Sequence, residues 1–153
     1  MITKRLRQGF TLIELLLVIA IIAILATIVI IAINPARQLA QANNAKRRSD
    51  VNAVLNAVYH NVIDNRGTLP SVIPTSSLGQ ICVTGTVTSS CTPGINLAQL
   101  TDNELYITAI PTDPTAVTAT GTGYYIIKTT TTNPRIRVTA PSAELSETIS
   151  VTR

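Results

Sequence analysis

The 153-residue sequence lacks most of the residues from which enzymes build active sites. It has one histidine, two cysteines, one methionine and no tryptophan, and only 13% of its residues are charged. His60 has no second histidine at metal-ligand spacing and no cysteine near it in the chain. No Ser-His-Asp grouping, glycine-rich phosphate loop or metal-ligand cluster can be recognised. These absences argue against an enzyme and favour a structural or binding protein, with His60 as a surface or contact residue.

The sequence also lacks an even distribution of charge. Seven of the 12 basic residues flank a long apolar run: Lys4, Arg5, Arg7, Arg37, Lys46, Arg47 and Arg48. From residue 49 onward, seven acidic residues outnumber five basic ones, so the net charge of +4 does not mark a nucleic-acid-binding domain. The group at residues 46–50 fits either a patch for DNA or phospholipid, or a solvated helix face or subunit-contact ion pairs. We expect the second, and nucleic acid is not indicated as a partner.

The apolar run predicts a membrane-spanning helix. Nineteen residues from Leu15 to Ile33 contain one polar residue, Thr27, and a helix of this length spans about 30 Å of hydrocarbon. The run exceeds the apolar core of about 7–15 residues in a secretory signal peptide. Basic residues before it predict a single-pass anchor in the cell membrane, with the carboxyl-terminal part outside the cytoplasm. Glu14 at the head of the run is unexpected, because a charged side chain in the bilayer is costly.

The residues around Glu14 carry a specific signal. In KRLRQGFTLIE, Gly9 separates a basic leader from the apolar run, and Glu14 follows five residues later. This pattern resembles the class III signal peptide of type IV pilins and type II secretion pseudopilins. The resemblance implies that a prepilin peptidase cuts between Gly9 and Phe10, removes the leader 1–9, and methylates the amino terminus of Phe10.

The resemblance also implies a role for Glu14 and a set of partners. In that family this glutamate is thought to pair with the amino terminus of a neighbouring subunit during assembly. The alternatives for Glu14 are solvation at headgroup level and pairing with its own amine. The implied partners are other copies of the chain and other pilins, the peptidase, and an inner-membrane platform with its ATPase.

Three functions remain from the residues and the resemblance. The first is a structural subunit that polymerises through its amino-terminal helix into a surface filament for adhesion, motility, DNA uptake or secretion. The second is a type II secretion pseudopilin in a periplasmic or envelope pseudopilus. The third is a membrane-anchored binding module that never polymerises, and processing at Gly9 distinguishes this module from the other two.

Residues 10–67 predict one long helix. Residues 10–35 form the transmembrane and assembly segment, and Pro35 predicts a kink because proline removes a helical hydrogen bond. Residues 36–67 form an amphipathic second half with one apolar stripe: Val51, Val54, Leu55, Val58 and Val62. Gly67 predicts the end of the helix.

Residues 68–153 predict an exported β-rich domain. Candidate strands cover residues 81–87, 124–130, 135–139 and 148–152, while residues 105–110 fit either a strand or a short helical turn. Short strands after one long helix predict an α+β, pilin-like fold with an antiparallel sheet on the apolar stripe.

Two features of this domain concern covalent and metal chemistry. Cys82 and Cys91 lie close together in an apparently exported domain, which favours a disulfide over a metal site. The loop at 109–116 resembles the calcium loop of pseudopilins, but Asp113 is its only carboxylate, whereas calcium takes six to eight oxygen ligands. We therefore expect a proline-stiffened loop and no cofactor, with calcium as the alternative.

Overall fold

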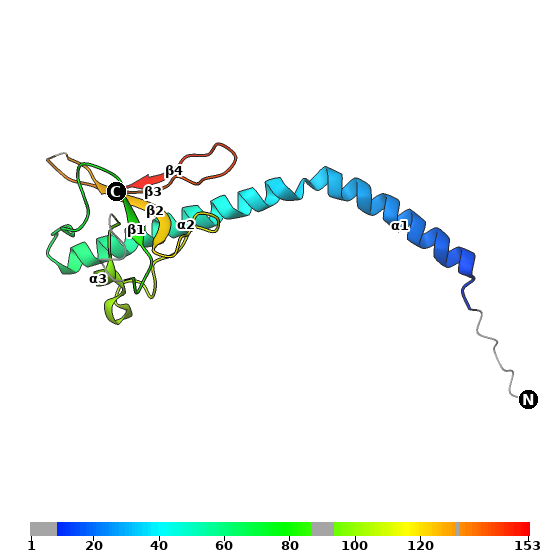
Figure 1. Cartoon of the computed structure of the whole chain (residues 1–153), viewed down its shortest axis with the longest axis horizontal. Coiled ribbons are helices and arrows are strands. Elements are labelled where there is room, and N and C mark those ends of the chain that lie inside the picture. The colour runs from blue at the N-terminus through cyan, green and yellow to red at the C-terminus, as the bar shows by residue number, and fades with distance from the viewer. Residues whose placement is uncertain (1–8, 87–93, 131) are drawn as a thin grey trace, which may run out of the picture. The chain divides into compact units, whose positions relative to one another are not determined.

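A computed structural model of the chain describes residues 9–86, 94–130 and 132–153. The chain divides into two compact units, Met1–Gln38 and Leu39–Arg153, and we call the second unit the head. Figure 1 shows the order of the elements along the chain, with two helices before the first strand.

Helix α1 spans Leu12–Ile33. It begins with a capping box, in which the Thr11 side chain accepts from the Glu14 backbone and the Glu14 side chain accepts from the Thr11 backbone. Its one polar residue beyond the first turn, Thr27, donates its hydroxyl proton to the carbonyl of Ala23 at 2.9 Å. None of the 22 residues of α1 is buried, and its length and composition suit a membrane span.

The helix is interrupted at Asn34 instead of continuing through a kink. Asn34 adopts a left-handed backbone conformation with φ 48°, which ends α1. Its side-chain oxygen then accepts from the backbone N–H of Arg37 at 3.2 Å, so Asn34 also caps the next helix. Pro35 is the first residue of α2 (Pro35–Asp64). At this position a backbone N–H would have no helical acceptor, so proline costs the helix no hydrogen bond.

Helix α2 buries one face and ends in a Schellman motif. Its buried residues include the predicted apolar stripe and extend it in both directions: Ala40, Asn44, Arg47, Val51, Val54, Leu55, Ala57, Val58, Asn61 and Val62. At the end, the N–H of Gly67 donates to the carbonyl of Val62 at 2.8 Å, and that of Arg66 donates to Ile63 at 3.2 Å. Arg66 takes the left-handed position with φ 55°.

The sheet has four antiparallel strands in the order β1-β2-β3-β4. The strands are β1 (Gly79–Cys82), β2 (Gly121–Lys128), β3 (Ile136–Ala140) and β4 (Ile149–Thr152). Val138 pairs with Ile126 on one side and Val151 on the other, which fixes the register of three strands. Between β1 and β2 lie the short helix α3 (Ala98–Thr101) and the 3-10 turn η2 (Asp102–Glu104).

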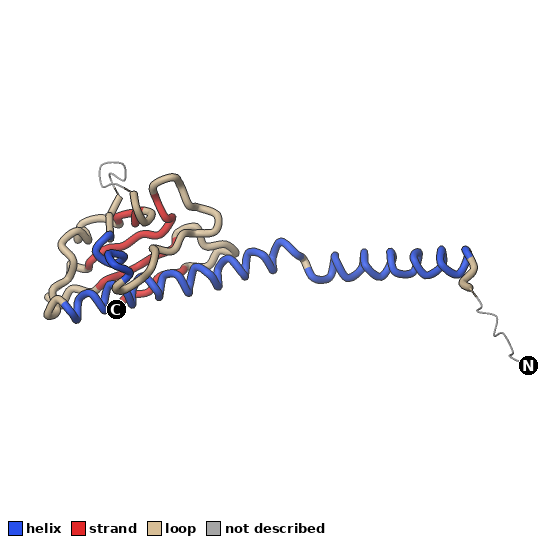
Figure 2. Tube along the Cα trace, turned by 90° about the horizontal axis from the view of Figure 1, so that it is seen from below, coloured by secondary structure: helices blue, strands red, loops and turns tan. Residues whose placement is uncertain are grey.

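The core of the head lies between α2 and one face of the sheet. Figure 2 shows α2 running along the sheet. The α2 stripe packs with the inward-facing residues of the strands: Ile81, Tyr124, Ile126, Ile136, Val138, Ala140 and Ile149. The predicted α+β class is confirmed, with the helical part divided into two helices at Asn34.

Two strand predictions in the head differ from the structure. The first predicted strand stops at Cys82, because Thr84 and Gly85 form a turn in which Gly85 has φ 81°. Residues 105–110 form no strand, and the helical turn lies earlier, at 102–104. At the end of the segment 105–110, the backbone N–H of Ile110 donates to the Thr84 hydroxyl at 2.7 Å, so it bonds to a side chain and not to a neighbouring strand.

Candidate functional site

The predicted cleavage site lies in an exposed segment without tertiary contacts. A methyl group added at Gly9 would meet no heavy atom within 4 Å, and the Phe10 side chain is 90% exposed. Packing in the fold therefore does not require glycine at position 9. The bond between Gly9 and Phe10 is open to an enzyme.

Glu14 lies in the first turn of α1, and one of its two carboxylate oxygens accepts hydrogen bonds. Its Oε2 atom accepts from the backbone N–H and the hydroxyl of Thr11, both at 2.8 Å. Within the part of the chain that the structure describes, Oε1 has no hydrogen-bond partner. The signal for this capping box is present in the sequence as Thr-Leu-Ile-Glu at residues 11–14. An acidic group here also interacts favourably with the positive end of the helix dipole.

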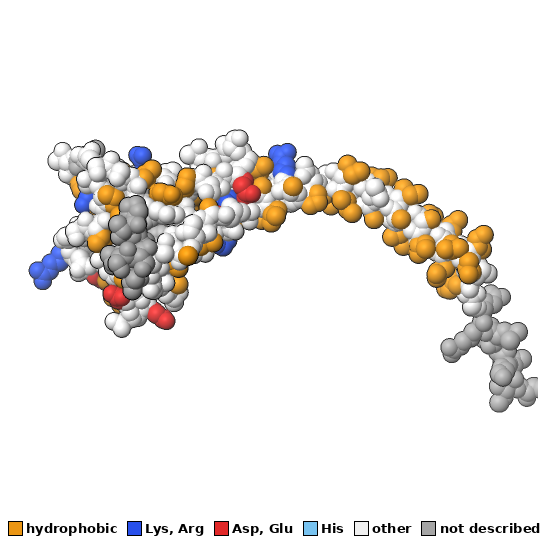
Figure 3. Space-filling view, in the orientation of Figure 1, with side chains coloured by type: hydrophobic (Ala, Val, Ile, Leu, Met, Phe, Trp, Pro, Cys, Tyr) orange, Lys and Arg blue, Asp and Glu red, His pale blue; other side chains and the backbone are white. Residues whose placement is uncertain are grey.

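The surface of α1 is exposed along its length and, apart from Glu14 and Thr27, apolar on all sides. Helices that are hydrophobic all round lie inside a membrane or inside a larger packed assembly. Figure 3 shows the continuous apolar surface along this unit. Chemically, α1 can be covered by lipid or by apolar helices of other chains.

The head contains a buried ion cluster, formed by Arg47, Asp113 and Glu144. The side chains of Arg47 and Asp113 are both fully buried. Arg47 donates from Nε to Asp113 Oδ2 at 2.8 Å and from Nη2 to Asp113 Oδ1 at 3.1 Å. Its Nη1 donates to Glu144 Oε2 at 2.8 Å and to Asn44 Oδ1 at 3.0 Å. The cluster joins α2 to two loops far along the chain.

The electrostatics of the cluster keep all three groups charged. The hydrogen bonds that Arg47 donates to Asp113 raise the pKa of Arg47 further above its already high value. Burial opposes ionisation of Asp113, but bonds from Arg47 and two backbone N–H groups outweigh it and lower the pKa of this carboxyl. The hydrogen bond from Arg47 lowers the pKa of Glu144 as well. A buried charge needs such partners, because desolvation is otherwise costly.

The prediction of a solvated face at residues 46–50 is wrong for Arg47. Arg47 lies four and seven positions before Val51 and Val54, so the helix turns it into the core with them. Its two neighbours also find partners within the chain. Lys46 pairs with Asp50 at 3.1 Å and donates to the carbonyl of Thr112 at 2.7 Å, while Arg48 pairs with Glu147. (Glu147 lies in the loop before β4.)

Asp113 is an ion-pair partner and not an open metal ligand. Besides Arg47, its Oδ1 accepts from the backbone N–H groups of Thr115 and Ala116, both at 2.9 Å. Donors thus occupy both carboxylate oxygens. Among the described residues, no group of three or more His, Cys, Asp or Glu side chains could hold a metal ion.

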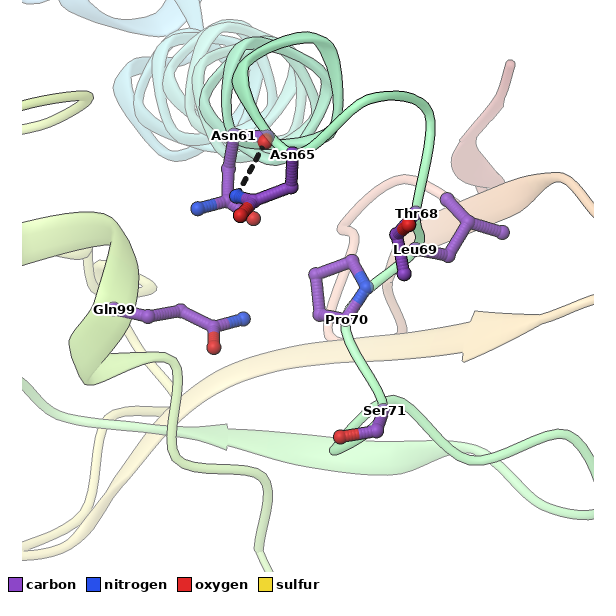
Figure 4. Close-up of a pocket in the computed structure, with 7 residues that line it drawn as sticks. All are labelled: Asn61, Asn65, Thr68, Leu69, Pro70, Ser71 and Gln99. Carbon is purple, nitrogen blue, oxygen red and sulfur yellow. Dashed lines mark hydrogen bonds between the residues drawn. The ribbon is translucent and has the colours of Figure 1, made fainter.

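One pocket of about 460 Å³ lies at the end of α2 (Figure 4). Its seven lining residues are Asn61, Asn65, Thr68, Leu69, Pro70, Ser71 and Gln99. None of the seven is titratable, and the carboxamide of Gln99 reaches toward Asn61 and Pro70 from α3. The pocket lining therefore offers no titratable acid or base.

The remaining predicted residues lie apart from these features. His60 is exposed on α2, as predicted. Cys82 is buried in β1, whereas Cys91 lies outside the described residues, so their disulfide stays a prediction.

Comparison with known proteins gives one match. The family described as "Prokaryotic N-terminal methylation motif" matches residues 4–30, which include Gly9, Phe10 and Glu14. No curated protein and no solved structure matches the chain significantly. The motif is the class III signal peptide of type IV pilins and pseudopilins, and the resemblance inferred from the sequence is thereby confirmed.

Proposed function

We propose that this chain, which carries the class III signal peptide of type IV pilins and pseudopilins, is a structural subunit that polymerises into a type IV pilus-like filament. A prepilin peptidase cuts between Gly9 and Phe10 and methylates the new amino terminus of Phe10. Helix α1 then forms the assembly surface. The observation that carries the proposal is a methylation motif followed by a 22-residue apolar helix without one buried residue.

The surface of α1 supports polymerisation on energetic grounds. Apolar surface removed from water contributes roughly 25 cal/mol per Å², so α1 is stable only where lipid or protein covers it. A subunit that leaves the membrane must therefore replace its lipid. Copies of the same helix supply equivalent apolar surface, and van der Waals packing between them holds the filament core together.

Glu14 gives the assembly its register in this proposal. Cleavage removes three basic side chains and creates a positive amine on Phe10. Glu14 Oε1 pairs with that amine on a neighbouring subunit, while Oε2 stays with Thr11 in the capping box. Opposite charges attract strongly where the dielectric constant is low, and a misplaced subunit would leave the carboxylate buried and unpaired.

The proposed location changes during assembly. Before assembly the chain is a single-pass protein of the inner membrane, with the head outside the cytoplasm. Afterwards it lies in a surface filament or in an envelope pseudopilus, assembled with other pilins by a membrane platform and an ATPase.

Mass spectrometry of the amino-terminal peptide from the native host tests the processing step. The expected peptide begins at Phe10 and carries one added methyl group on its amine. A Gly9 substitution should leave the leader attached without changing the fold, since nothing packs against Gly9. A native chain that keeps Met1 would refute the proposal.

Variants at two positions separate the assembly role of Glu14 from its capping role. Glu14→Ala removes the charge and the Glu14 side of the capping box, whereas Thr11→Ala removes the Thr11 hydroxyl from the capping box and keeps the carboxylate. We expect both variants to be processed and membrane-bound. Only Glu14→Ala should give few filaments after shearing. Equal filament yields from Glu14→Ala and the unmodified chain would exclude the pairing.

One observation favours a second candidate, a membrane-anchored binding module that never polymerises. The capping box accounts for a glutamate at position 14 without any neighbouring subunit. Such an anchor needs no cleavage at Gly9. The same amino-terminal mass therefore distinguishes the two functions.

A further inference from the structure

Five of the seven acidic side chains of the head have partners within the head. Residues 49–153 contain seven acidic residues. Five of them bind a cation or a tyrosine hydroxyl: Asp50, Asp64, Asp113, Glu144 and Glu147. The other two, Asp102 and Glu104, are exposed on η2 and form no ion pair within the described part of the chain.

The conformation of η2 presents these two carboxylates to solvent. Asn103 and Glu104 are both non-glycine residues in the left-handed region, with φ 54° and 56°. This conformation is unfavourable for residues with a Cβ atom. The next residue, Leu105, is 67% exposed, so an apolar side chain stands beside the acidic pair.

The opposite charge collects on the sheet face that points away from α2. Because side chains alternate along a strand, the outward residues of β2 and β3 are Tyr125, Ile127, Arg137 and Thr139, and Arg135 directly before β3 continues the row. We call this the outer sheet face. Residues 114–143 contain no acidic residue, so neither arginine has a carboxylate neighbour in its own hairpin.

Arg135 and Arg137 form hydrogen bonds within the head, but their charges remain available to a partner. Arg137 donates from Nε to the hydroxyl of Thr152 across the strands at 3.3 Å, and it pairs in register with Ile127. Arg135 is exposed, and its backbone N–H donates to the Thr129 hydroxyl at 2.8 Å. Within the described residues neither guanidinium has an ion-pair partner.

The two charged surfaces lie on different sides of the head. In Figure 1, α3 and the turn after it lie below α2, whereas β3 and β4 lie above it. In the same orientation, Figure 3 shows acidic side chains at the lower edge of the head and basic ones at its upper and left edges, with a further acidic group at the upper right. A second copy of the chain is therefore the partner whose charges match. A contact between two different surfaces of identical chains propagates into an open filament.

We propose that η2 of one subunit docks on the outer sheet face of the next copy in the filament. Asp102 and Glu104 pair with Arg135 and Arg137, and Leu105 packs against Ile127 between them. This inference rests on the proposed function, because it names the contact between heads in the filament. An apolar centre with a charged rim is the usual composition of such interfaces.

Charge reversal tests the contact in the full-length chain in its native host. Arg135→Glu with Arg137→Glu should reduce the yield of sheared filaments roughly tenfold, because two attractive pairs become repulsive. Asp102→Lys with Glu104→Lys should reduce it similarly. The fourfold variant restores the charge match and should recover most of the yield. Filaments of the unmodified chain should also shorten as salt is raised.

A matched control uses two cations outside the outer sheet face. Arg66→Glu with Lys128→Glu changes the net charge by the same amount and should assemble normally. Processing at Phe10 and the amount of membrane-bound protein are measured for every variant, so that a folding defect is recognised.

The outcomes separate this inference from the proposed function. An unmodified chain that forms no filaments refutes both. If the unmodified chain forms filaments and either reversal variant forms them at full yield, the head contact alone is refuted. Reversal variants that lose filaments without recovery in the fourfold variant also refute it.

Discussion

Replacing Arg47 with methionine should destabilise the head strongly. Methionine keeps an unbranched apolar stem in the core, so the change removes the guanidinium and little packing. Arg47 is the only cation in contact with Asp113 among the described residues, and both side chains are fully buried. Its loss leaves a buried carboxylate without a counter-charge.

The structure gives the size of the effect. Arg47 donates five side-chain hydrogen bonds, two of them to Asp113 and one each to Asn44, Thr115 and Glu144. Removing one partner of a buried ion pair costs about 3–5 kcal/mol, against a total stability of about 5–15 kcal/mol for a domain. Glu144 adds little to this cost, because its side chain is 35% exposed and water can solvate it.

Tyrosine fluorescence during urea unfolding measures the change in detergent, since all four tyrosines lie in the head and none in α1. The control is Arg47→Met combined with Asp113→Leu, which removes both buried charges. This double variant should unfold at higher urea than Arg47→Met alone, because no unpaired charge remains. A single variant that loses less than about 1 kcal/mol would show that the ion pair is not buried in solution.

Three further predictions concern the stability of the head. Because the folded pKa of Asp113 is lowered, its stabilisation is present above its ordinary pKa of about 3.9 and is lost as pH falls through the folded pKa. Urea midpoints between pH 6 and pH 2 should fall accordingly, and an equally steep fall in Asp113→Asn would contradict the assignment. Arg66→Gly should stabilise by about 1 kcal/mol, since Arg66 occupies a left-handed position that glycine adopts freely; an unchanged midpoint would count against this. Tyr124→Phe should cost about 1–2 kcal/mol by removing the 2.7 Å bond from the Tyr124 hydroxyl to Asp50, and a variant as stable as the parent would disprove it.

The strands of the carboxyl-terminal half could be read from the sequence with small errors. Residues 121–128, 136–140 and 149–152 form the strands predicted at 124–130, 135–139 and 148–152. In 136–140 and 149–152, β-branched residues alternate with polar ones, and residues 121–128 contain a run of aromatic and β-branched residues. Both are local signals. Helix α3 has no such signal, because its four residues are too few for a helical period to be visible.

The buried ion cluster could not be predicted in full from the sequence. The spacing of Arg47 from Val51 and Val54 placed it on the buried face, but a basic residue next to Lys46 and Arg48 suggests a solvated surface. Its partners lie 66 and 97 residues away. Only the folded chain reveals that pairing, since no local pattern connects an arginine to carboxylates so distant.

The helix break at Asn34 and the cap of α1 could be predicted from the sequence. Asn-Pro at 34–35 combines a residue that adopts left-handed conformations with one suited to a first helical position. Proline alone predicts a kink in one helix, whereas Asn34 and Pro35 together predict that one helix ends and a second begins. Similarly, the charge of Glu14 predicts a partner outside the helix, whereas the Thr-x-x-Glu spacing predicts its bond to the backbone of Thr11.

The distance along the chain between the members of the ion cluster sets the time at which the head can fold. A ribosome adding about 5–20 residues per second needs about 5–20 s to proceed from Arg47 to Glu144. During that interval α2 has been synthesised but its arginine has no carboxylate partner from the loops. Strand β4, which closes the sheet, is made later still. The newborn chain therefore exposes an apolar stripe and an unpaired cation until its last residues emerge, and a chain truncated before residue 144 should be recognised and degraded as unfolded protein.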